Sequence, residues 1–577
     1  MPEADAVIVG VGWAGGILAA ELSKAGLHVV GLERGMNRQT EDWLDRDELK
    51  YAVRHEMMQN PAHETWTLRH NLREPALPWR QLGSFLPGTG LGGSGVHWNG
   101  QTWRYHPWDF TMRSSTIARY GRRALPEGTT IQDWGITYEE LEPYYDRFEY
   151  MAGISGKAGN LRGKIQPGGN PFEGPRAREY PTPPMARSRT VALFEETAAR
   201  LGYHPFRGPS ANLSVGYRNP DGVVRGPCVY CGFCERFGCE VGAKASPNVT
   251  VLPVALATGR FELRTGCYVF RVDHDGRRAI GVSYYDTTGQ EVQQPAAIVI
   301  LTSYVFNNVR LLLLSKMGRP YDPTTGEGVV GKNYAYQVGG GGAAYFTDRT
   351  FEPFMGAGAL SEVIDDFNAD NFDHAGLGFI GGASISASNT GARPIQYLPV
   401  PPGTPPWGAQ WKAAIRRYHN STFSVGAQGG VLSYRDAFLD LDPNYRDQWG
   451  LPLVRMTFDW HDNERKMIAY VVGKIEGILR ATGAKTYAAN PHLPEHYDAA
   501  VYQSTHNTGG AIMGADPATS VVNNYLQMWD FDNVWVVGAS AFPQQAGFNP
   551  TGTVGALAYR AADGIVNRYW RRPGPLV

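Results

Sequence analysis

Residues 6–33 read AVIVGVGWAGGILAAELSKAGLHVVGLE, and this stretch decides the fold. Ala6–Val9 is a short apolar run typical of a β-strand, and Ile17–Ala25 has the spacing of an amphipathic helix. A second apolar run, His28–Leu32, predicts another strand, and Glu33 stands directly at its end. Strand, helix and strand in this order predict a βαβ unit, the opening part of a Rossmann-like sheet.

Three glycines, Gly10, Gly12 and Gly15, occupy the turn after the first strand in the spacing G-x-G-x-x-G. Glycine lets the backbone turn tightly and lets its N–H groups approach a pyrophosphate at the start of the helix. Glu33 follows the last glycine by 18 residues, which suits a carboxylate that accepts a hydrogen bond from a ribose hydroxyl. The unit therefore predicts a dinucleotide-binding domain rather than a purely structural turn.

The composition narrows the class of protein. The chain has 577 residues, 42% of them hydrophobic, and its 54 Lys and Arg nearly balance 55 Asp and Glu for a net charge of −1. These values exclude a disordered chain and a polybasic nucleic-acid binder, so no nucleic-acid partner is expected. Polar residues interrupt the most apolar run, Ala297–Leu314, so no transmembrane helix is predicted. Glu3 and Asp5 stand where a secretory leader needs positive charge, so this chain is expected to carry no export signal.

The rest of the chain predicts an α/β protein, α+β overall, with two interleaved domains. Strand-like runs over 261–303 and a strand–turn–helix pattern over 533–571 extend the nucleotide-binding domain. Residues 340–500 alternate aromatic-rich strand-like runs with Gly/Pro loops, which favours an antiparallel sheet. The predicted nucleotide-binding domain comprises 1–100, 225–335 and 500–577, and the predicted substrate-binding domain comprises 101–224 and 336–499.

A second glycine-rich stretch, residues 83–100, reads GSFLPGTGLGGSGVHWNG and contains seven glycines. Flexible connectors have such compositions. The interleaved Leu86, Leu91 and Trp98 favour instead an ordered segment that lies against a flat ligand.

Four of the five cysteines, Cys228, Cys231, Cys234 and Cys239, lie within twelve residues in the spacing C-x2-C-x2-C-x4-C. Clustered thiols indicate a metal site in segment 226–246 rather than a disulfide framework. The spacing is close to that of bacterial ferredoxins, although the last gap is longer and no proline follows, and it favours an iron–sulfur cluster over structural zinc. A cluster accepts electrons singly, as flavin can deliver them and nicotinamide cannot, so the predicted dinucleotide is FAD.

Two polar turns flank the last predicted strand. His506 lies in the turn THNTGG (505–510), and Asn549 lies in GFNPT (547–551) just before the final helix. Most of the fourteen histidines are expected to lie at the surface, or in the core with their ring nitrogens hydrogen-bonded. The position of His506 makes it a candidate catalytic base.

The acidic stretch Asp365–Asp373 has a composition that calcium-binding loops share. A loop starting at Asp366 would need Gly at position 371 and Glu at position 377, where the sequence has Asn371 and Leu377. The stretch is therefore expected to be a solvated loop.

These segments together resemble the glucose–methanol–choline (GMC) oxidoreductase family over the whole chain and in the right order. Within that family, the cysteine cluster and the closing residues Pro573–Val577 are similar to the large flavoprotein subunits of bacterial membrane-bound gluconate 2-dehydrogenases. The matching segments are Gly10–Gly15 with Glu33, Gly92–Gly95, Asn307–Gly318, Val330–Asn333, Gly450–Pro452 and the surroundings of His506 and Asn549.

The resemblance implies a Rossmann-like FAD-binding domain with an interleaved substrate domain built on an antiparallel sheet. His506 would be the base that takes the alcohol proton, with Asn549 as its partner at the developing alkoxide, while a hydride passes to flavin N5. His97 matches a position that some members bond covalently to the flavin, with a noncovalent aromatic wall as the alternative. The implied cofactor contacts are Gly10, Gly12, Gly15, Glu33, Gly92, Gly93, Ser94, His97, Asn99, Gly538, Ala539, Pro550 and Thr551.

The resemblance also implies a cluster type. Related sugar dehydrogenases carry a three-iron (3Fe-4S) cluster, which needs only three thiolates. Comparison with them favours Cys228, Cys234 and Cys239 as ligands and leaves the role of Cys231 open.

The implied reaction oxidises a secondary hydroxyl of a sugar acid, D-gluconate to 2-keto-D-gluconate, with 2-ketogluconate, sorbitol, glucose and fructose as alternative substrates. An oxygen-using sugar oxidase and an electron-transfer subunit without its own substrate are the competing functions. A sugar acid needs a cation near its carboxylate, and Arg104, His106 and Arg455 are available for that role.

The implied partners are a small subunit with a twin-arginine leader and a multihaem cytochrome c subunit that passes electrons to quinone. The small subunit would carry the flavoprotein across the bacterial inner membrane. The expected location is the periplasmic face of that membrane, with membrane contact only through a partner.

Overall fold

The computed structural model describes residues 2–82, 85–391, 393–501 and 503–576. Its Rossmann-like sheet has seven strands. Six follow the order β10-β2-β1-β13-β12-β11, and β21 pairs with β13. The strands are β1 (Ala4–Val9), β2 (Val29–Glu33), β10 (Phe261–Thr265), β11 (Tyr268–His274), β12 (Ala279–Tyr285), β13 (Glu291–Leu301) and β21 (Val534–Val536). β1 pairs in parallel with β2 and β13, and β10 and β21 extend the parallel part. The predicted Rossmann-like sheet is confirmed.

The centre of this sheet is β1. Residues Ala6–Val9 are buried, and Val7 pairs with Val30 of β2 and Val299 of β13. A strand enclosed by neighbours and covered on its faces needs a continuous apolar run, as the sequence provides. α1 (Trp13–Lys24) starts at Trp13, earlier than predicted, directly after its cap residue Gly12.

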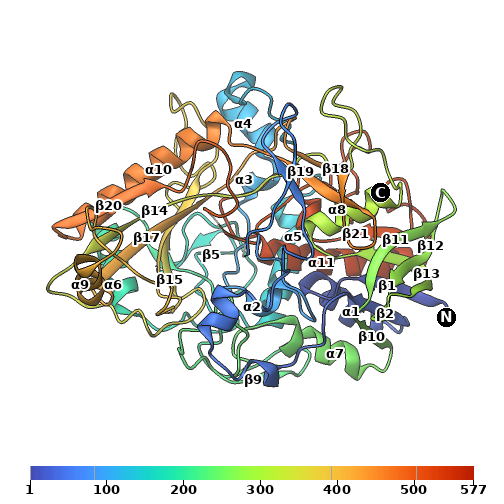
Figure 1. The fold of residues 1–577 in the computed structure, drawn as a ribbon, viewed down its shortest axis with the longest axis horizontal. Helices are drawn as coiled ribbons and strands as arrows, with labels where there is room; N and C mark the ends of the chain where they lie inside the picture. The colour runs from blue at the N-terminus through green and yellow to red at the C-terminus, as the bar shows by residue number, and fades with distance from the viewer. Residues whose placement is uncertain (1, 83–84, 392, 502, 577) are drawn as a thin grey trace.

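A six-stranded antiparallel sheet in the order β20-β14-β17-β16-β15-β7 occupies the other half of the molecule (Figure 1). Its strands are β7 (Phe206–Arg207), β14 (Val338–Tyr345), β15 (Ser361–Ile364), β16 (Ala383–Ser388), β17 (Thr422–Gly429) and β20 (Thr486–Pro491). The twenty-residue helix α10 (Asp462–Ala481) packs on this sheet. A Cβ on Gly340 of β14 would lie 2.7 Å from the side chain of Val472, so glycine lets α10 approach closely.

A third sheet joins the two halves. Its order is β18-β19-β3-β4, with β18 (Phe438–Arg446), β19 (Pro452–Thr457), β3 (Thr67–Arg69) and β4 (Leu77–Pro78). β3 comes from the first hundred residues and pairs in parallel with β19. The two predicted domains thus share a sheet, and their exact boundaries stay a prediction.

The remaining elements are short hairpins and helices. The hairpins are β5 (Asn160–Leu161) with β6 (Lys164–Ile165) and β8 (Tyr217–Arg218) with β9 (Val224–Arg225). The helices are α2 (Ser94–His97), α3 (Pro107–Phe110), α4 (Met112–Tyr120), α5 (Tyr138–Ala152), α6 (Arg189–Arg200), α7 (Val251–Ala257), α8 (Val305–Leu314), α9 (Ala409–Tyr418) and α11 (Thr551–Gly564). Among the described residues, no helix combines the length and apolarity that a membrane crossing needs.

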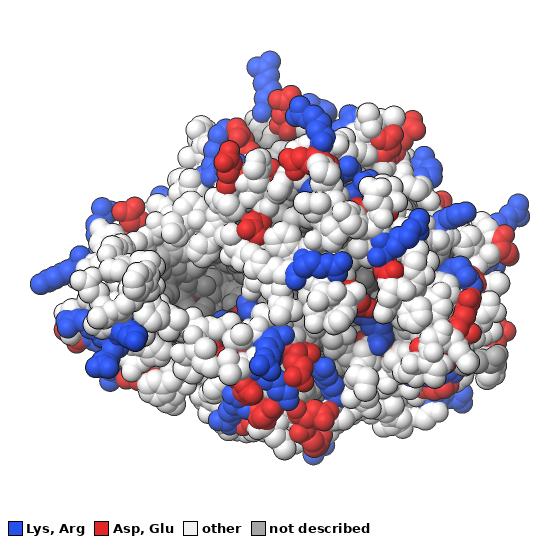
Figure 2. Space-filling model, viewed as in Figure 1, with Lys and Arg blue, Asp and Glu red and all other residues white. Residues whose placement is uncertain are grey.

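The surface reflects the balanced composition. Figure 2 shows Lys and Arg interspersed with Asp and Glu over this face of the molecule. A deep hollow opens where Figure 1 places β15 and β17, and mainly uncharged residues surround it.

The acidic stretch Asp365–Asp373 is not the solvated loop expected from its composition. Asp365 is fully buried and accepts hydrogen bonds from Asn170 Nδ2 at 2.5 Å and Asn368 Nδ2 at 3.2 Å. Phe367 is buried beside it. Side-chain amides replace water around the carboxylate, an arrangement that composition does not reveal.

Candidate functional site

A long cavity opens at the carboxyl ends of β1, β2, β13 and β21, the edge where parallel sheets bind ligands. The space between its walls, open solvent at the mouth included, is about 1400 Å³. Nine of the predicted cofactor residues line it: Gly10, Gly12, Glu33, Gly93, Ser94, Gly538, Ala539, Pro550 and Thr551. The fold thus brings three distant segments of the sequence to one elongated cavity.

Two predicted glycines shape the cavity without lining it. A Cβ on Gly15 would lie 2.1 Å from the carbonyl oxygen of Gly10, so only glycine allows α1 to start this close to the turn. Gly92 has a φ of +89°, and a Cβ there would lie 2.0 Å from Asn248 Oδ1. Both positions hold the backbone where a pyrophosphate would meet the first turn of α1.

Glu33 is buried at the end of β2 and faces the turn. Its Oε2 accepts a hydrogen bond from the N–H of Val11 at 3.0 Å, and its Oε1 accepts one from Gly35 at 2.9 Å. Each carboxylate oxygen retains a further lone pair for a ribose hydroxyl. Two cations that the sequence pattern did not single out, Arg34 and Arg310, also line the cavity.

The second glycine-rich stretch is ordered where it is described, and Gly83 and Ser84 lie outside the described residues. His97 and Asn99 belong to this stretch but do not line the cavity. Asn99 Oδ1 accepts a hydrogen bond from Ala359 N at 2.8 Å. His97 is 3% exposed, and its Nε2 has no hydrogen-bond partner among the described residues.

His97 is therefore an unusual histidine. Burial, together with the nearby charges of Lys244 and Arg236, lowers the pKa of His97 to about 3. The ring is therefore neutral at ordinary pH, and its Nε2 has unused hydrogen-bonding capacity.

His506 and Asn549 meet beside the cavity. Asn549 Nδ2 lies 3.1 Å from His506 Nε2, and the sequence neighbours Thr505 and Pro550 line the cavity wall. His506 is 8% exposed, and burial lowers its pKa to about 4. The imidazole is therefore neutral at ordinary pH, as a base that removes an alcohol proton must be.

Two further residues, which the sequence pattern did not single out, contact this pair. Gln337 Oε1 lies 2.5 Å from His506 Nδ1, and Trp103 Nε1 lies 3.1 Å from Asn549 Oδ1. Gln337 directly precedes β14, and no local pattern distinguishes it from the chain's other glutamines. Trp103 stacks on Phe548 with ring centroids 4.6 Å apart, and only its position three residues beyond the glycine-rich stretch points toward the site.

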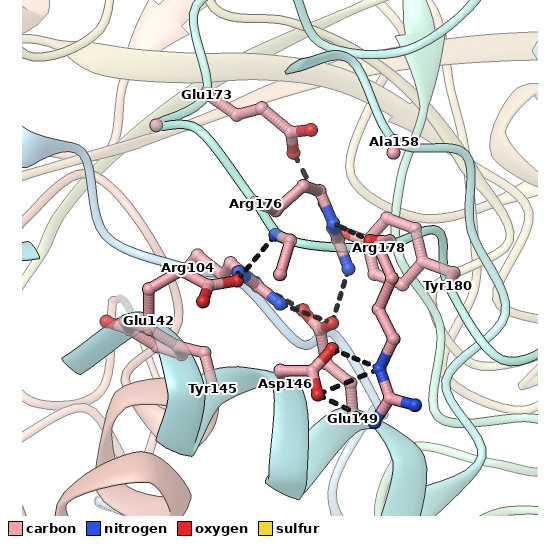
Figure 3. A network of polar contacts seen from close by, with 12 residues as sticks. Arg104, Glu142, Tyr145, Asp146, Glu149, Ala158, Glu173, Arg176, Arg178 and Tyr180 are labelled. Atoms are coloured by element: carbon pink, nitrogen blue, oxygen red, sulfur yellow. Dashed lines mark hydrogen bonds and ion pairs between the residues drawn. The ribbon is translucent and has the colours of Figure 1, made fainter. Parts of the chain in front are cut away.

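The cations proposed for a substrate carboxylate are already paired or packed. Arg104 bonds to Glu149 at 2.7 Å and to Glu142 at 2.8 Å, within a buried network that Figure 3 shows together with Arg176. This network ties the chain near residue 104 to α5, so Arg104 has a structural role.

The other two candidates are also occupied. Arg455 pairs with Asp440 at 2.8 Å across β18 and β19. His106 stacks on Phe548 at 5.0 Å between ring centroids, and its Nδ1 lies 3.2 Å from the carbonyl oxygen of Phe172. Of the three, only His106 lies against the loop that carries Asn549.

The four clustered cysteines, Cys228, Cys231, Cys234 and Cys239, are free thiols that line one small cavity together with Trp43. Burial raises the pKa of Cys228 to about 11 and that of Cys234 to about 12. Such thiols become thiolates only when a cation is bound to them. Among the described residues, no three His, Cys, Asp or Glu side chains are arranged to hold a single metal ion.

Three of these sulfurs accept hydrogen bonds from N–H groups. Tyr230 N donates to Cys228 Sγ at 3.3 Å, and Lys244 N donates to Cys239 Sγ at 3.4 Å. Asn212 Nδ2 donates to Cys234 Sγ at 3.6 Å. Hydrogen bonds to the sulfurs set the potential of iron–sulfur centres, so this donor set fits such a group.

Lys244 connects the cysteine segment to the glycine-rich stretch. Its side chain is buried, and Nζ donates to the carbonyl oxygens of Trp98 at 2.9 Å, Cys234 at 2.6 Å and Phe237 at 2.9 Å. An ammonium group has three donors, and all three are used.

Known proteins resemble this chain along its whole length. Residues 433–558 match the family described as GMC oxidoreductase. The chain is 48% identical to the gluconate 2-dehydrogenase flavoprotein of Pantoea cypripedii, with 100% of this chain and 96% of the relative covered. It is 25% identical to the fructose dehydrogenase large subunit of Gluconobacter japonicus, with 98% of each chain covered.

The fold is shared with a solved structure. The crystal structure of pyridoxine 4-oxidase from Mesorbium loti superimposes with a TM-score of 0.57 at 16% identity, covering 98% of this chain and 100% of the other. Together with the full-length relative at 48% identity, the residues assembled around the cavity identify the family. The chain belongs to the GMC oxidoreductases and is an FAD-dependent enzyme that oxidises CH–OH groups.

Proposed function

We propose that the protein oxidises the secondary C2 hydroxyl of D-gluconate to give 2-keto-D-gluconate. The observation that carries the proposal is the His506–Asn549 pair, 3.1 Å apart beside the cavity, in a chain 48% identical to a gluconate 2-dehydrogenase flavoprotein. The fructose dehydrogenase relative, at 25% identity, keeps fructose as an alternative substrate. Sorbitol, glucose and 2-ketogluconate are the remaining alternatives.

The chemistry follows from the residues at the site. The neutral ring of His506 takes the hydroxyl proton at Nε2, the nitrogen that faces Asn549. Asn549 Nδ2 is placed to donate a hydrogen bond to the oxygen as negative charge develops on it. Bound FAD supplies the acceptor for the hydride that leaves the same carbon.

In this proposal the cysteine segment would hold an iron–sulfur cluster, with the 3Fe-4S type favoured, and the cluster would supply a one-electron acceptor. Hydrogen bonds to the sulfurs of Cys228, Cys234 and Cys239 support these three as ligands. No such bond to Cys231 is found among the described residues. The unpartnered Nε2 of His97 supports a covalent bond between this residue and the flavin.

The proposed complex contains two further subunits, a small exported subunit and a multihaem cytochrome c that passes electrons to quinone. The relative's designation as a flavoprotein supports an enzyme that needs partners to complete its electron transfer. We place the complex on the periplasmic face of the inner membrane, with membrane contact through the cytochrome subunit.

A substrate panel tests the proposal. Purified protein is supplied with an artificial dye acceptor and D-gluconate, 2-ketogluconate, glucose, sorbitol or fructose. The highest kcat/KM is expected with D-gluconate, and no hydrogen peroxide should form when oxygen is the only acceptor. A higher kcat/KM with fructose would make fructose the substrate in place of D-gluconate. Rapid peroxide formation would make the protein an oxidase.

A further inference from the structure

Gln337 contacts His506 in an orientation that its other neighbours determine. Its Nε2 lies 3.0 Å from the carbonyl oxygen of Ala546 and 2.7 Å from that of Phe548. A backbone carbonyl can only accept hydrogen bonds, so the NH2 group of Gln337 must face these two oxygens. The amide oxygen Oε1 therefore faces His506 Nδ1 at 2.5 Å, and Nδ1 must carry the proton that it donates.

An independent constraint acts on the other ring nitrogen. Trp103 Nε1 can only donate, and it lies 3.1 Å from Asn549 Oδ1 and 3.2 Å from Gln101 Oε1. The amide oxygen of Asn549 is thereby turned toward the indole, and its NH2 group faces His506 Nε2 at 3.1 Å. Nε2 must accept this hydrogen bond, so it carries a lone pair and no proton.

Both constraints select the same tautomer of His506. We propose that Gln337 and Trp103 are positioning residues that fix His506 as the Nδ1–H tautomer and keep Nε2 available as the proton acceptor. Gln337 acts directly on Nδ1, and Trp103 acts through the amide of Asn549. The identity of the alcohol rests on the proposed function, whereas the tautomer rests only on the hydrogen bonds of the protein.

The tautomer decides whether the ring can act as a base. In the Nδ1–H form, the substrate hydroxyl takes the place of the Asn549 N–H at the Nε2 lone pair and gives its proton to Nε2, and the resulting imidazolium keeps its Nδ1–H bonded to Gln337 Oε1. That proton and the hydride lost from carbon together account for the two hydrogens and two electrons that the alcohol loses. In the Nε2–H form, the ring would present an N–H group to the hydroxyl and could not take its proton.

Nuclear magnetic resonance tests the tautomer without reference to activity. The FAD-loaded protein is labelled with 15N-histidine, and the His506 signals are identified by their loss in His506→Ala. At pH 7 we expect a protonated Nδ1 and an unprotonated Nε2. A protonated Nε2 in the wild-type protein would overturn the inference, whatever the variants do.

Kinetics then test the two positioning residues. Gln337→Leu removes the acceptor, and Trp103→Phe removes the donor but keeps an aromatic ring on Phe548. Each change is expected to lower the rate of FAD reduction by substrate about tenfold with little change in KM. The rate of FAD reduction in the double variant should fall by more than the product of the two single-variant factors. The reason is that in each single variant the remaining constraint still favours the Nδ1–H tautomer.

Gln527 provides a matched control. It is also fully buried, its Nε2 donates to the carbonyl oxygens of Asp532 and Gly574, and its Oε1 accepts from Leu576 N. Gln527→Leu should lower the Tm but keep the rate within twofold of the wild type. Equal rates in Gln337→Leu and Gln527→Leu would assign Gln337 a structural role only. If no sugar acid reduces the wild-type FAD, the proposed function fails, and the nitrogen spectrum still decides the tautomer.

Discussion

Asn549 Nδ2 lies 3.1 Å from His506 Nε2, although 43 residues separate the two in sequence. One residue precedes β21 and the other follows it, and β21 pairs in parallel with β13 at the edge where the cavity opens. β21, the last strand of the Rossmann-like sheet in chain order, thus brings both turns to the cofactor cavity. In the proposed mechanism, catalysis depends on that strand as well as on the two side chains.

Removal of the base should abolish most of the activity. We predict that His506→Ala slows FAD reduction by substrate by about 10²–10⁴-fold, because the change removes the general base of the proposed mechanism. The flavin spectrum and FAD content should stay unchanged. The exposed His63 serves as control, since His63→Ala should keep the wild-type rate. A His506→Ala rate within threefold of the wild type would remove His506 from the mechanism.

The pH dependence should reflect the burial of the base. Because burial lowers the pKa of His506 to about 4, the ring stays neutral from about pH 5 upward. The rate of FAD reduction should be level across neutral pH and should fall only as acid protonates the ring near pH 4. An exposed histidine would place that fall near pH 6.5. Stopped-flow mixing into buffers of different pH measures the midpoint, and a midpoint near 6.5 would contradict the burial of His506.

The glycine at the start of α1 should be essential for cofactor binding. Gly15→Ala places a Cβ 2.1 Å from the carbonyl oxygen of Gly10, so the turn must open and FAD affinity should fall at least tenfold. Gly473→Ala in α10 is the matched control, because nothing lies within 4 Å of its Cβ. That change should stabilise the protein by about 0.5–1 kcal/mol. FAD titration and thermal unfolding measure the two effects, and retained FAD in Gly15→Ala would count against the pyrophosphate turn.

Local signals explain which parts of the structure the sequence predicts. The turn around Gly10 carries a short-range signature, because its three glycines lie within six residues of one another. Gln337 lies 169 residues from His506 and reaches it only because long-range sheet pairing brings the start of β14 to the site. The burial of Asp365 escaped prediction for the same reason, since its amide partner Asn170 is 195 residues away.

Lys244 should hold the cysteine segment in place. Lys244→Met removes three hydrogen bonds and leaves the carbonyl oxygens of Trp98, Cys234 and Phe237 buried without that donor. Each lost hydrogen bond costs about 1–3 kcal/mol, so the Tm should fall by several degrees and iron content should drop. The exposed Lys412 is the control, and Lys412→Met should change neither value. An unchanged Tm and iron content in Lys244→Met would show that the cysteine segment does not depend on this residue.

The most direct measurement is anaerobic mixing of the purified, FAD-loaded protein with D-gluconate while the absorbance of oxidised flavin is followed. We expect the flavin to be reduced in a single turnover, one 2-keto-D-gluconate to form for each FAD, and His506→Ala to remain oxidised over the same period. The flavin staying oxidised with D-gluconate, or His506→Ala being reduced at the wild-type rate, would contradict a gluconate-oxidising site built on His506.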